Sequence, residues 1–234
     1  MKTLITKAYT LEKTPNSCSF SLYINGNHRE QIYESISHLL SNICYTCYDN
    51  QNEKLIFLAE TVITLSDFCK KTNQDQKEEQ ILLEKATYMI KMLSEQIEIL
   101  KTKNLAFYGF DLDDVLMIND NLFIIVNANN ILELDKERKS YITFNAPFDL
   151  PYFSSPELIE LKTLPAQIDY RTSYYSLGAL LTYFLLKEYL FLGNEVMREK
   201  AIEKCLNPIF YTKVYWFLKR CLKEKCNERI LFFI

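Results

Sequence analysis

The chain has 234 residues, of which 48% are hydrophobic and 24% charged, a balance that predicts a folded globular protein and excludes a disordered one. The formal net charge of -3 gives no electrostatic reason to expect a nucleic-acid partner, because nucleic-acid binding requires a basic surface. The glycines Gly26, Gly109, Gly178 and Gly193 lie too far apart to form a glycine-rich phosphate loop.

The cysteines and the hydropathy bear on location. Seven cysteines, an odd number, are scattered along the chain, and residues 1–13 carry charges where a secretory signal has its apolar core. We therefore expect free thiols in an intracellular, cytoplasmic protein. The apolar stretch 174–186 is shorter than the roughly 20 residues that a bilayer requires, so no membrane span is expected.

The first sixty residues predict strands around one amphipathic helix. Short strands are expected in the first 25 residues, and the last of them, Cys18–Ile24, alternates polar and apolar residues before the turn Asn25–Asn27. Apolar residues at three- and four-residue spacing predict a helix from His28 to Ile43. Two further strands are expected at 43–48 and 55–58.

Beyond residue 60 the pattern is mainly helical. Thr64 is a suitable N-cap for a short helix, and residues 81–101 predict a long amphipathic one. Two strands, 115–118 and 122–126, follow around a hairpin turn, and a polar loop spans 133–140. Further helices are predicted at 155–161, 174–192, 195–206 and 212–222.

Three short motifs occur in the last third of the chain, and their order is informative. They are Ser155-Pro156-Glu157, then Tyr175-Ser176-Leu177-Gly178 opening an apolar helix, then a late Cys-Leu followed by Glu228-Arg229. This order resembles the C-lobe of protein kinases, in which Ala-Pro-Glu closes the activation segment, Trp-Ser-Leu-Gly follows on a helix, and a late Arg pairs with the Glu. The resemblance implies an ion pair between Glu157 and Arg229.

The resemblance also implies a fold. We expect an α+β, two-lobed protein-kinase-like fold in a single domain. Residues 1–60 would form a reduced, strand-containing N-lobe, and residues 61–234 a mainly helical C-lobe. The divergence and the composition resemble the degenerate kinase-like proteins that large DNA viruses encode.

The residues that perform kinase chemistry do not match. Anchoring the catalytic loop on the strand 115–118 puts Gly109 at the position of the catalytic Asp and Asp114 at that of the metal-binding Asn. Asn127 stands where the Asp of Asp-Phe-Gly holds Mg²⁺, and an amide is a weaker ligand for a hard cation than a carboxylate. Gly109 cannot accept a proton or a hydrogen bond from a substrate hydroxyl. A shifted alignment would make Asp111 the catalytic base.

The nucleotide-binding residues are missing as well. No Gly-x-Gly-x-x-Gly precedes the strand 18–24, and the strand carries no lysine. Glu30 or Glu34 could correspond to the helix Glu that pairs with that lysine, but we interpret both as solvent-facing carboxylates. Ser173 replaces an Asp that braces the catalytic loop in kinases, so we expect this brace to be lost.

These losses suggest a pseudokinase, a non-catalytic protein that binds another protein as a scaffold or allosteric partner and needs no cofactor. Two alternatives remain open. The chain could be an atypical active Ser/Thr kinase that uses Asp111, Asp113 or Asp114 with Mg-ATP, or it could be a structural component of a viral assembly in the host cytoplasm. The three aspartates can equally be turn-formers and helix caps.

Two further patterns have simpler interpretations. Cys44 and Cys47 have the spacing of a zinc half-site, but no second pair exists, and we expect buried free thiols in a strand. The aromatic stretch 208–218 contains the only tryptophan, Trp216. We expect it to pack in the core, with an exposed patch for a protein partner as the alternative.

Overall fold

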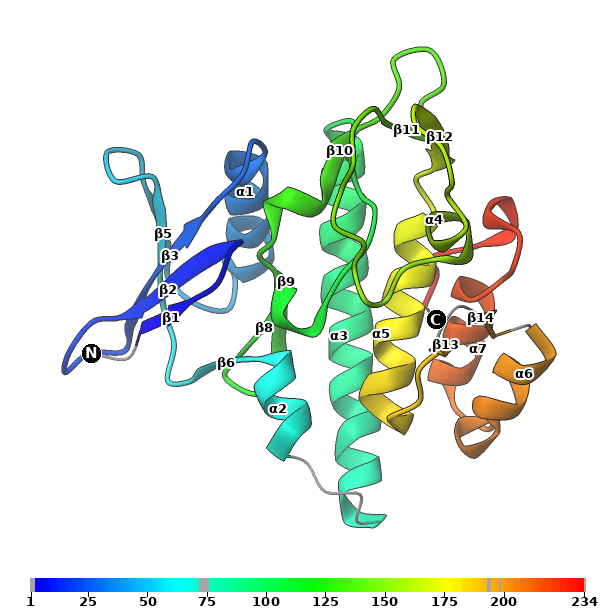
Figure 1. Ribbon diagram of the computed structural model, residues 1–234. Coiled ribbons are helices and arrows are strands. Elements are labelled where there is room, and N and C mark those ends of the chain that lie inside the picture. Colours follow the sequence, from blue (N-terminus) through cyan, green and yellow to red (C-terminus); the bar gives the residue numbers. More distant parts are fainter. Residues whose placement is uncertain (1–2, 72–75, 193–194, 198, 234) are drawn as a thin grey trace.

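The structure is a computed structural model that describes residues 3–71, 76–192, 195–197 and 199–233. Its N-terminal part is a five-stranded antiparallel sheet with one helix, seen in blue and cyan in Figure 1. The strand order is β1-β2-β3-β5-β4. The bounds are β1 Thr3–Ile5, β2 Tyr9–Lys13, β3 Ser19–Ile24, α1 Arg29–Leu40, β4 Thr46–Asp49 and β5 Lys54–Leu58.

This sheet and helix confirm the predicted secondary structure. The alternation along β3 places Phe20, Leu22 and Ile24 in the core, as a half-buried strand requires. Helix α1 buries its apolar stripe, which includes Ile32 and Ile36, against the same core.

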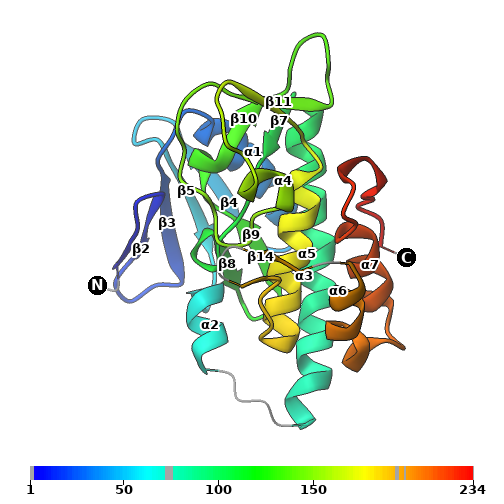
Figure 2. The same ribbon diagram turned by 45° about the vertical axis from the view of Figure 1, so that its right-hand side comes forward.

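The C-terminal part is mainly helical. Figures 1 and 2 show α3 and α5 side by side at its centre, with α6 and α7 on the side away from the sheet. The helices are α2 Leu65–Lys71, α3 Gln76–Thr102, α4 Pro156–Ile159, α5 Thr172–Leu186, α6 Glu199–Cys205 and α7 Lys213–Cys221. No helix among the described residues is both long and apolar enough to cross a membrane.

Among the described residues, the remaining strands form four small sheets. The three-stranded sheet β6-β8-β9 follows the segment that joins the lobes, and three two-stranded ladders lie elsewhere in the C-terminal part. The strands are β6 Val62–Thr64, β7 Leu105–Phe107, β8 Val115–Ile118, β9 Leu122–Ile125, β10 Ile131–Glu133, β11 Tyr141–Phe144, β12 Ala166–Asp169, β13 Phe191–Leu192 and β14 Glu195–Val196. The sequence predicted β8 and β9, which a hairpin turn joins, and missed the pairs β7–β10 and β11–β12, whose partner strands are short and far apart in the sequence.

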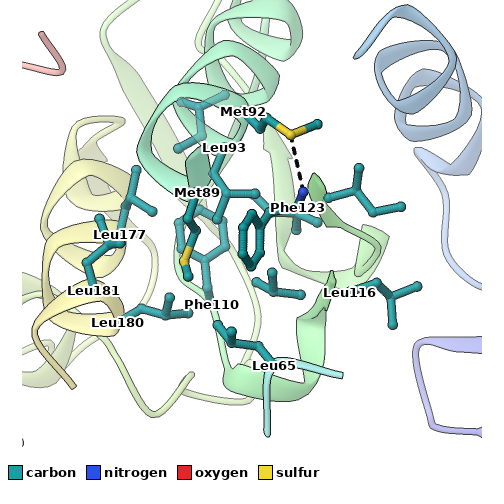
Figure 3. Close-up of a cluster of buried hydrophobic side chains, with 14 of the residues drawn as sticks. Leu65, Met89, Met92, Leu93, Phe110, Leu116, Phe123, Leu177, Leu180 and Leu181 are labelled. Carbon is teal, nitrogen blue, oxygen red and sulfur yellow. Dashed lines mark hydrogen bonds between the residues drawn. The ribbon is translucent and has the colours of Figure 1, made fainter. Parts of the chain in front are cut away.

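The largest hydrophobic core extends through both parts of the molecule, and one section of it lies between α3, α5 and the β8–β9 hairpin. In Figure 3, Met89 and Leu93 of α3 face Leu177 and Leu181 of α5, and Phe123 fills the space beside them. Burying such side chains stabilises the fold by about 1.5–3 kcal/mol each relative to leaving them in water. The core therefore fixes the segments on either side of the hairpin, which form the site described below.

One buried polar residue joins three elements of this core. The amide of Gln96 on α3 accepts from Ile125 N at 2.7 Å and donates to Ile125 O at 2.9 Å. It also donates to Ser35 Oγ of α1 at 3.1 Å. These bonds align α1 and β9 along α3.

Two predicted helices have different bounds. The helix predicted at 174–192 ends at Leu186, because Lys187 adopts the left-handed conformation with φ of 58° and its N–H closes the last turn on Tyr183 O. The helix predicted at 195–206 begins only at Glu199, after the short strand β14. Residue 198, inside the predicted range, lies outside the described residues.

Candidate functional site: the cleft between the lobes

A cleft of about 830 Å³ separates the sheet from the helical part. Its walls come from four segments, the β1–β2 turn, the residues before β8, the residues after β9 and the loop 147–153, together with Ser66 of α2 and Tyr189. Of the residues singled out from the sequence, the walls include Asp111, Asp113, Asp114 and Asn127. The fold therefore brings together, at one cleft, the residues that the alignment assigned to the metal-binding Asn and to the Asp of Asp-Phe-Gly, Asp114 and Asn127.

Gly109, which the alignment puts at the position of the catalytic Asp, does not line this cleft. Gly109 is buried beneath Pro151, and a Cβ at position 109 would lie 2.9 Å from Pro151 Cγ. Pro151 itself lines the cleft. The position that aligns with the catalytic Asp is therefore sealed by the loop that precedes α4, and it has no room for a side chain.

The brace of this loop is relocated. Ser173 Oγ donates to Tyr170 O within its own turn and does not reach the catalytic-loop segment. Ser176 takes over, because its Oγ accepts from Phe110 N at 2.9 Å. The loop is thus still held by α5. The expectation that this contact is lost is wrong, because Ser176, one helical turn after Ser173, makes a contact of the same kind.

Asp114 is the centre of a buried polar cluster. Its two carboxylate oxygens accept from Asn127 Nδ2 at 2.8 Å, from Asp111 N at 2.8 Å and from Asn130 Nδ2 at 3.2 Å. Asn130 also donates to Gly109 O at 3.2 Å. The side chains at the catalytic-loop Asn position and the Asp-Phe-Gly Asp position are therefore bonded to each other.

Burial shifts the acidity of this cluster. Burial raises the pKa of Asp114 to about 7, with smaller contributions from the nearby charges of Asp111 and Asp113. The pKa of Asp111 is also raised by burial, although its carboxylate accepts from Tyr152 N at 2.5 Å. Asp113 is exposed, and its carbonyl accepts from Tyr9 OH of β2 at 3.1 Å, a contact between the lobes.

The β1–β2 turn is the part of the five-stranded sheet that lines the cleft. It consists of Thr6, Lys7 and Ala8, and Thr6 Oγ1 accepts from Ala8 N at 3.2 Å and Tyr9 N at 3.0 Å. The turn's carbonyls are engaged by Asn25, whose N donates to Ala8 O and whose Nδ2 donates to Lys7 O. The two amides that Thr6 engages are not available to cradle a phosphate group.

The strand–helix contact that a lysine–glutamate pair makes in active kinases is made here by a tyrosine. Tyr33 of α1 accepts from Ile24 N of β3 at 2.6 Å and donates to Glu53 O at 3.0 Å. Glu30 is exposed, and Glu34 is exposed and pairs with Lys103 at the end of α3. Both glutamates are solvent-facing carboxylates, as predicted.

The segment that joins the lobes is also internally satisfied. The Asn119 side chain accepts from Glu60 N at 2.8 Å and from Thr61 N at 3.2 Å, and Asn119 N donates to Thr61 O at 3.0 Å. These bonds tie the joining segment to the β8–β9 turn.

The residues of this cleft differ from those with which protein kinases hold Mg-ATP. Catalysis on ATP requires backbone donors and a lysine for the phosphates and oxygen ligands for Mg²⁺. Here Thr6 consumes two turn amides, β3 carries no lysine, and Asp114 is occupied by two amide groups. Within the described part of the chain, no group of three or more His, Cys, Asp or Glu side chains is placed to hold a metal ion.

Glu157 and Arg229 lie behind the cleft, where α4 meets the end of the chain. Arg229 donates from Nη1 to Glu157 Oε1 at 2.5 Å and from Nη2 to Oε2 at 2.8 Å. Arg229 is 2% exposed, and its Nε also donates to Lys223 O at 2.8 Å. Burial raises the pKa of Glu157, but the bonds and charge of Arg229 outweigh it and hold that pKa below its usual value.

The two remaining sequence patterns differ from expectation. Cys47 on β4 is exposed and Cys44 is half-buried ahead of it, so they are not buried thiols of one strand. In the aromatic stretch, Tyr215 and Phe217 are buried, whereas Trp216 is 52% and Tyr211 is 96% exposed. The expectation that the whole stretch packs in the core is therefore wrong, because α7 points only one of its faces inward.

No protein-family model matches the sequence, and no curated protein matches it either. Among solved structures, the Cydia pomonella granulovirus kinase PK-1 is similar, with a TM-score of 0.53 and 15% sequence identity over 98% of this chain and 88% of that chain. At this identity the similarity shows the fold alone. The chain has a protein-kinase-like α+β fold with a strand-containing N-lobe and a mainly helical C-lobe, which confirms the predicted fold class.

Proposed function

We propose that this chain is a pseudokinase, which transfers no phosphate and acts by binding another protein as a scaffold or allosteric partner. The observation that carries the proposal is Gly109 beneath Pro151. A kinase needs a carboxylate at this position to orient the substrate hydroxyl. Here neither the residue nor the space for one exists.

The nucleotide side supports the same proposal. Thr6 satisfies two amides of the β1–β2 turn, and Tyr33 replaces the pair that links β3 to α1. The amides of this turn are donors that an active kinase directs at the phosphates of ATP, and here Thr6 takes two of them. A site that had kept its nucleotide would leave these donors open.

An exposed aromatic patch supports a protein partner. It consists of Phe210, Tyr211 and Trp216, whose rings contact one another or the buried Tyr215. Tyrosine and tryptophan are common anchors of protein interfaces because they bury a large area at little entropic cost. Lys219 lies 5.9 Å above the Trp216 ring, so a cation already borders the patch.

The test is the thermal stability of the protein with ATP, with and without Mg²⁺. A ligand present at a hundred times its Kd stabilises the native state by about 2.7 kcal/mol. We expect no change in Tm at millimolar ATP under either condition, and an active protein kinase serves as the positive control. Stabilisation that depends on Mg²⁺ would contradict the proposal.

A second candidate rests on the three carboxylates of Asp111, Asp113 and Asp114, which line one cleft. In that case the chain is an atypical Ser/Thr kinase that uses Mg-ATP. Transfer of the γ-phosphate to a protein substrate, lost in an Asp111→Asn variant, would establish this function in place of the first.

The proposal includes an origin and a location. We propose that the chain is virus-encoded and works in the host cytoplasm; its fold similarity to a granulovirus kinase is in line with this. Affinity capture from infected cells separates a regulatory partner from a structural role. Recovery with a host or viral regulatory protein supports the scaffold, and recovery only within assembled particles supports a structural component.

A further inference from the structure

A second, smaller pocket lies on the side of the helical part, away from the cleft. It has a volume of about 170 Å³ and is formed by α4, the start of α5, α6 and the segment after α7. Its apolar lining includes Pro156, Ile202 and Leu222. A pocket of this size fits one long side chain and is too small for a nucleotide.

One residue that lines this pocket has a buried hydroxyl without a partner. Tyr175 lines it and is 2% exposed, and its OH has no hydrogen-bond partner in the structure. Leaving a buried hydroxyl unpaired costs about 1–3 kcal/mol. The ring of Tyr175 is already covered by the Arg229 guanidinium, whose Cζ lies 5.0 Å from the ring centroid, so the unsatisfied group is the hydroxyl alone.

Carboxylates surround the same pocket. Glu157, Glu160, Glu199 and Glu224 all line it. Glu157 is paired with Arg229, and Glu199 is paired with Lys223. Glu160 is exposed and forms no ion pair with any residue that the structure describes. The pocket therefore offers an apolar wall, a buried hydroxyl and the exposed carboxylate of Glu160.

We propose that this pocket binds an arginine side chain of the partner protein, an inference that rests on the proposed function. An arginine has an apolar stem for the wall formed by Ile202 and Leu222. Its planar guanidinium has five donors in a fixed fork, so one side chain has donors for both the Tyr175 hydroxyl and the Glu160 carboxylate. A lysine presents a single point charge and cannot make both contacts with the same geometry.

The proposed arginine belongs to the partner protein and not to this chain. Arg198 follows Met197, which lines the pocket, but Arg198 lies outside the described residues. It is the nearest residue in the sequence that could supply the same chemistry. The experiment therefore includes an Arg198→Ala variant.

The test is a titration of the isotope-labelled full chain by NMR with N-acetyl-arginine methylamide. The uncharged, nearly isosteric N-acetyl-citrulline methylamide is the matched control ligand. We expect saturable shifts at millimolar arginine probe for the amides of Tyr175, Ile202 and Leu222, and none with citrulline. Glu160→Gln is expected to weaken binding about tenfold and Tyr175→Phe about threefold, because the first loses a charged hydrogen bond and the second a neutral one.

A Glu203→Gln variant is the matched control protein. Glu203 is on α6 like Glu199, but it pairs with Lys219 and does not line the pocket. Its affinity for the probe should be unchanged. Equal binding of citrulline, equal binding by the Glu160→Gln variant, or binding that occurs only after Arg198→Ala would overturn the proposal.

Failure of this inference is distinguishable from failure of the proposed function. No arginine binding together with no stabilisation by Mg-ATP refutes the pocket alone. Stabilisation by Mg-ATP refutes the pseudokinase and leaves the titration of the pocket as an independent result.

Discussion

Replacing Arg229 with methionine should destabilise the protein by about 3 kcal/mol. The change removes two bonds to Glu157 and the bonds to Lys223 O and Glu224 O, and it leaves Glu157 without its counter-ion. Removing one partner of a buried ion pair costs about 3–5 kcal/mol. The low end applies because the Glu157 side chain is 26% exposed and water can partly solvate it.

Urea denaturation followed by circular dichroism measures this difference, and a loss of about 3 kcal/mol corresponds to a fall in Tm of roughly 6–12 °C for a chain of this size. Lys219→Met is the matched control, because the Lys219–Glu203 pair has a similar distance of 2.8 Å with side chains 32% and 43% exposed. It should cost less than about 1 kcal/mol. If Arg229→Met costs no more than Lys219→Met, burial does not decide the strength of this pair, and the reasoning is refuted.

Three further predictions follow from the cleft and the pocket. Burial raises the pKa of Asp114 to about 7 in the folded state, from a value near 4 in the unfolded state, so the folded state binds a proton more tightly. The stabilisation that comes from this bound proton is fully present below about pH 4 and is lost as the pH rises through about 7. The free energy of unfolding, measured by urea titration, should fall by up to about 4 kcal/mol over this pH range, and the Asp114→Asn variant should show a flatter dependence on pH. If the variant keeps the same pH dependence, Asp114 is not the group responsible. Gly109→Ala should destabilise the protein by about 1–3 kcal/mol, because the added methyl group would collide with Pro151, and this cost should disappear in a Pro151→Gly background. Equal costs in both backgrounds would contradict the packing described for position 109. Tyr175→Phe should leave stability unchanged or raise it by about 1 kcal/mol in a thermal-shift assay, since no hydrogen bond is lost, and a clear loss of stability would mean that the hydroxyl has a partner.

The sequence by itself determined the elements with a strong local period. The apolar spacing in residues 81–101 gave most of α3, the spacing after His28 gave α1, and the alternation in residues 18–24 gave β3. Thr64 caps α2 as expected, since its Oγ1 accepts from Asp67 N at 3.0 Å. Such features depend on neighbours a few residues apart, which a single sequence displays directly. The order of the C-lobe motifs added the fold class.

Only the tertiary structure decided which distant residues hold the walls of the cleft in place. The bond between Ser176 and Phe110 N joins residues 66 apart, and the bond between Tyr9 OH and Asp113 O joins residues 104 apart. Pro151 reaches Gly109 across the fold in the same way. Nothing in the local sequence of Tyr9 or Pro151 distinguishes these residues from ordinary turn or core residues, and the motif that contains Ser176 does not reveal which backbone group its hydroxyl meets. Their roles arise because packing of α3 against α5 and the β8–β9 hairpin brings distant backbone groups within hydrogen-bonding and van der Waals distance.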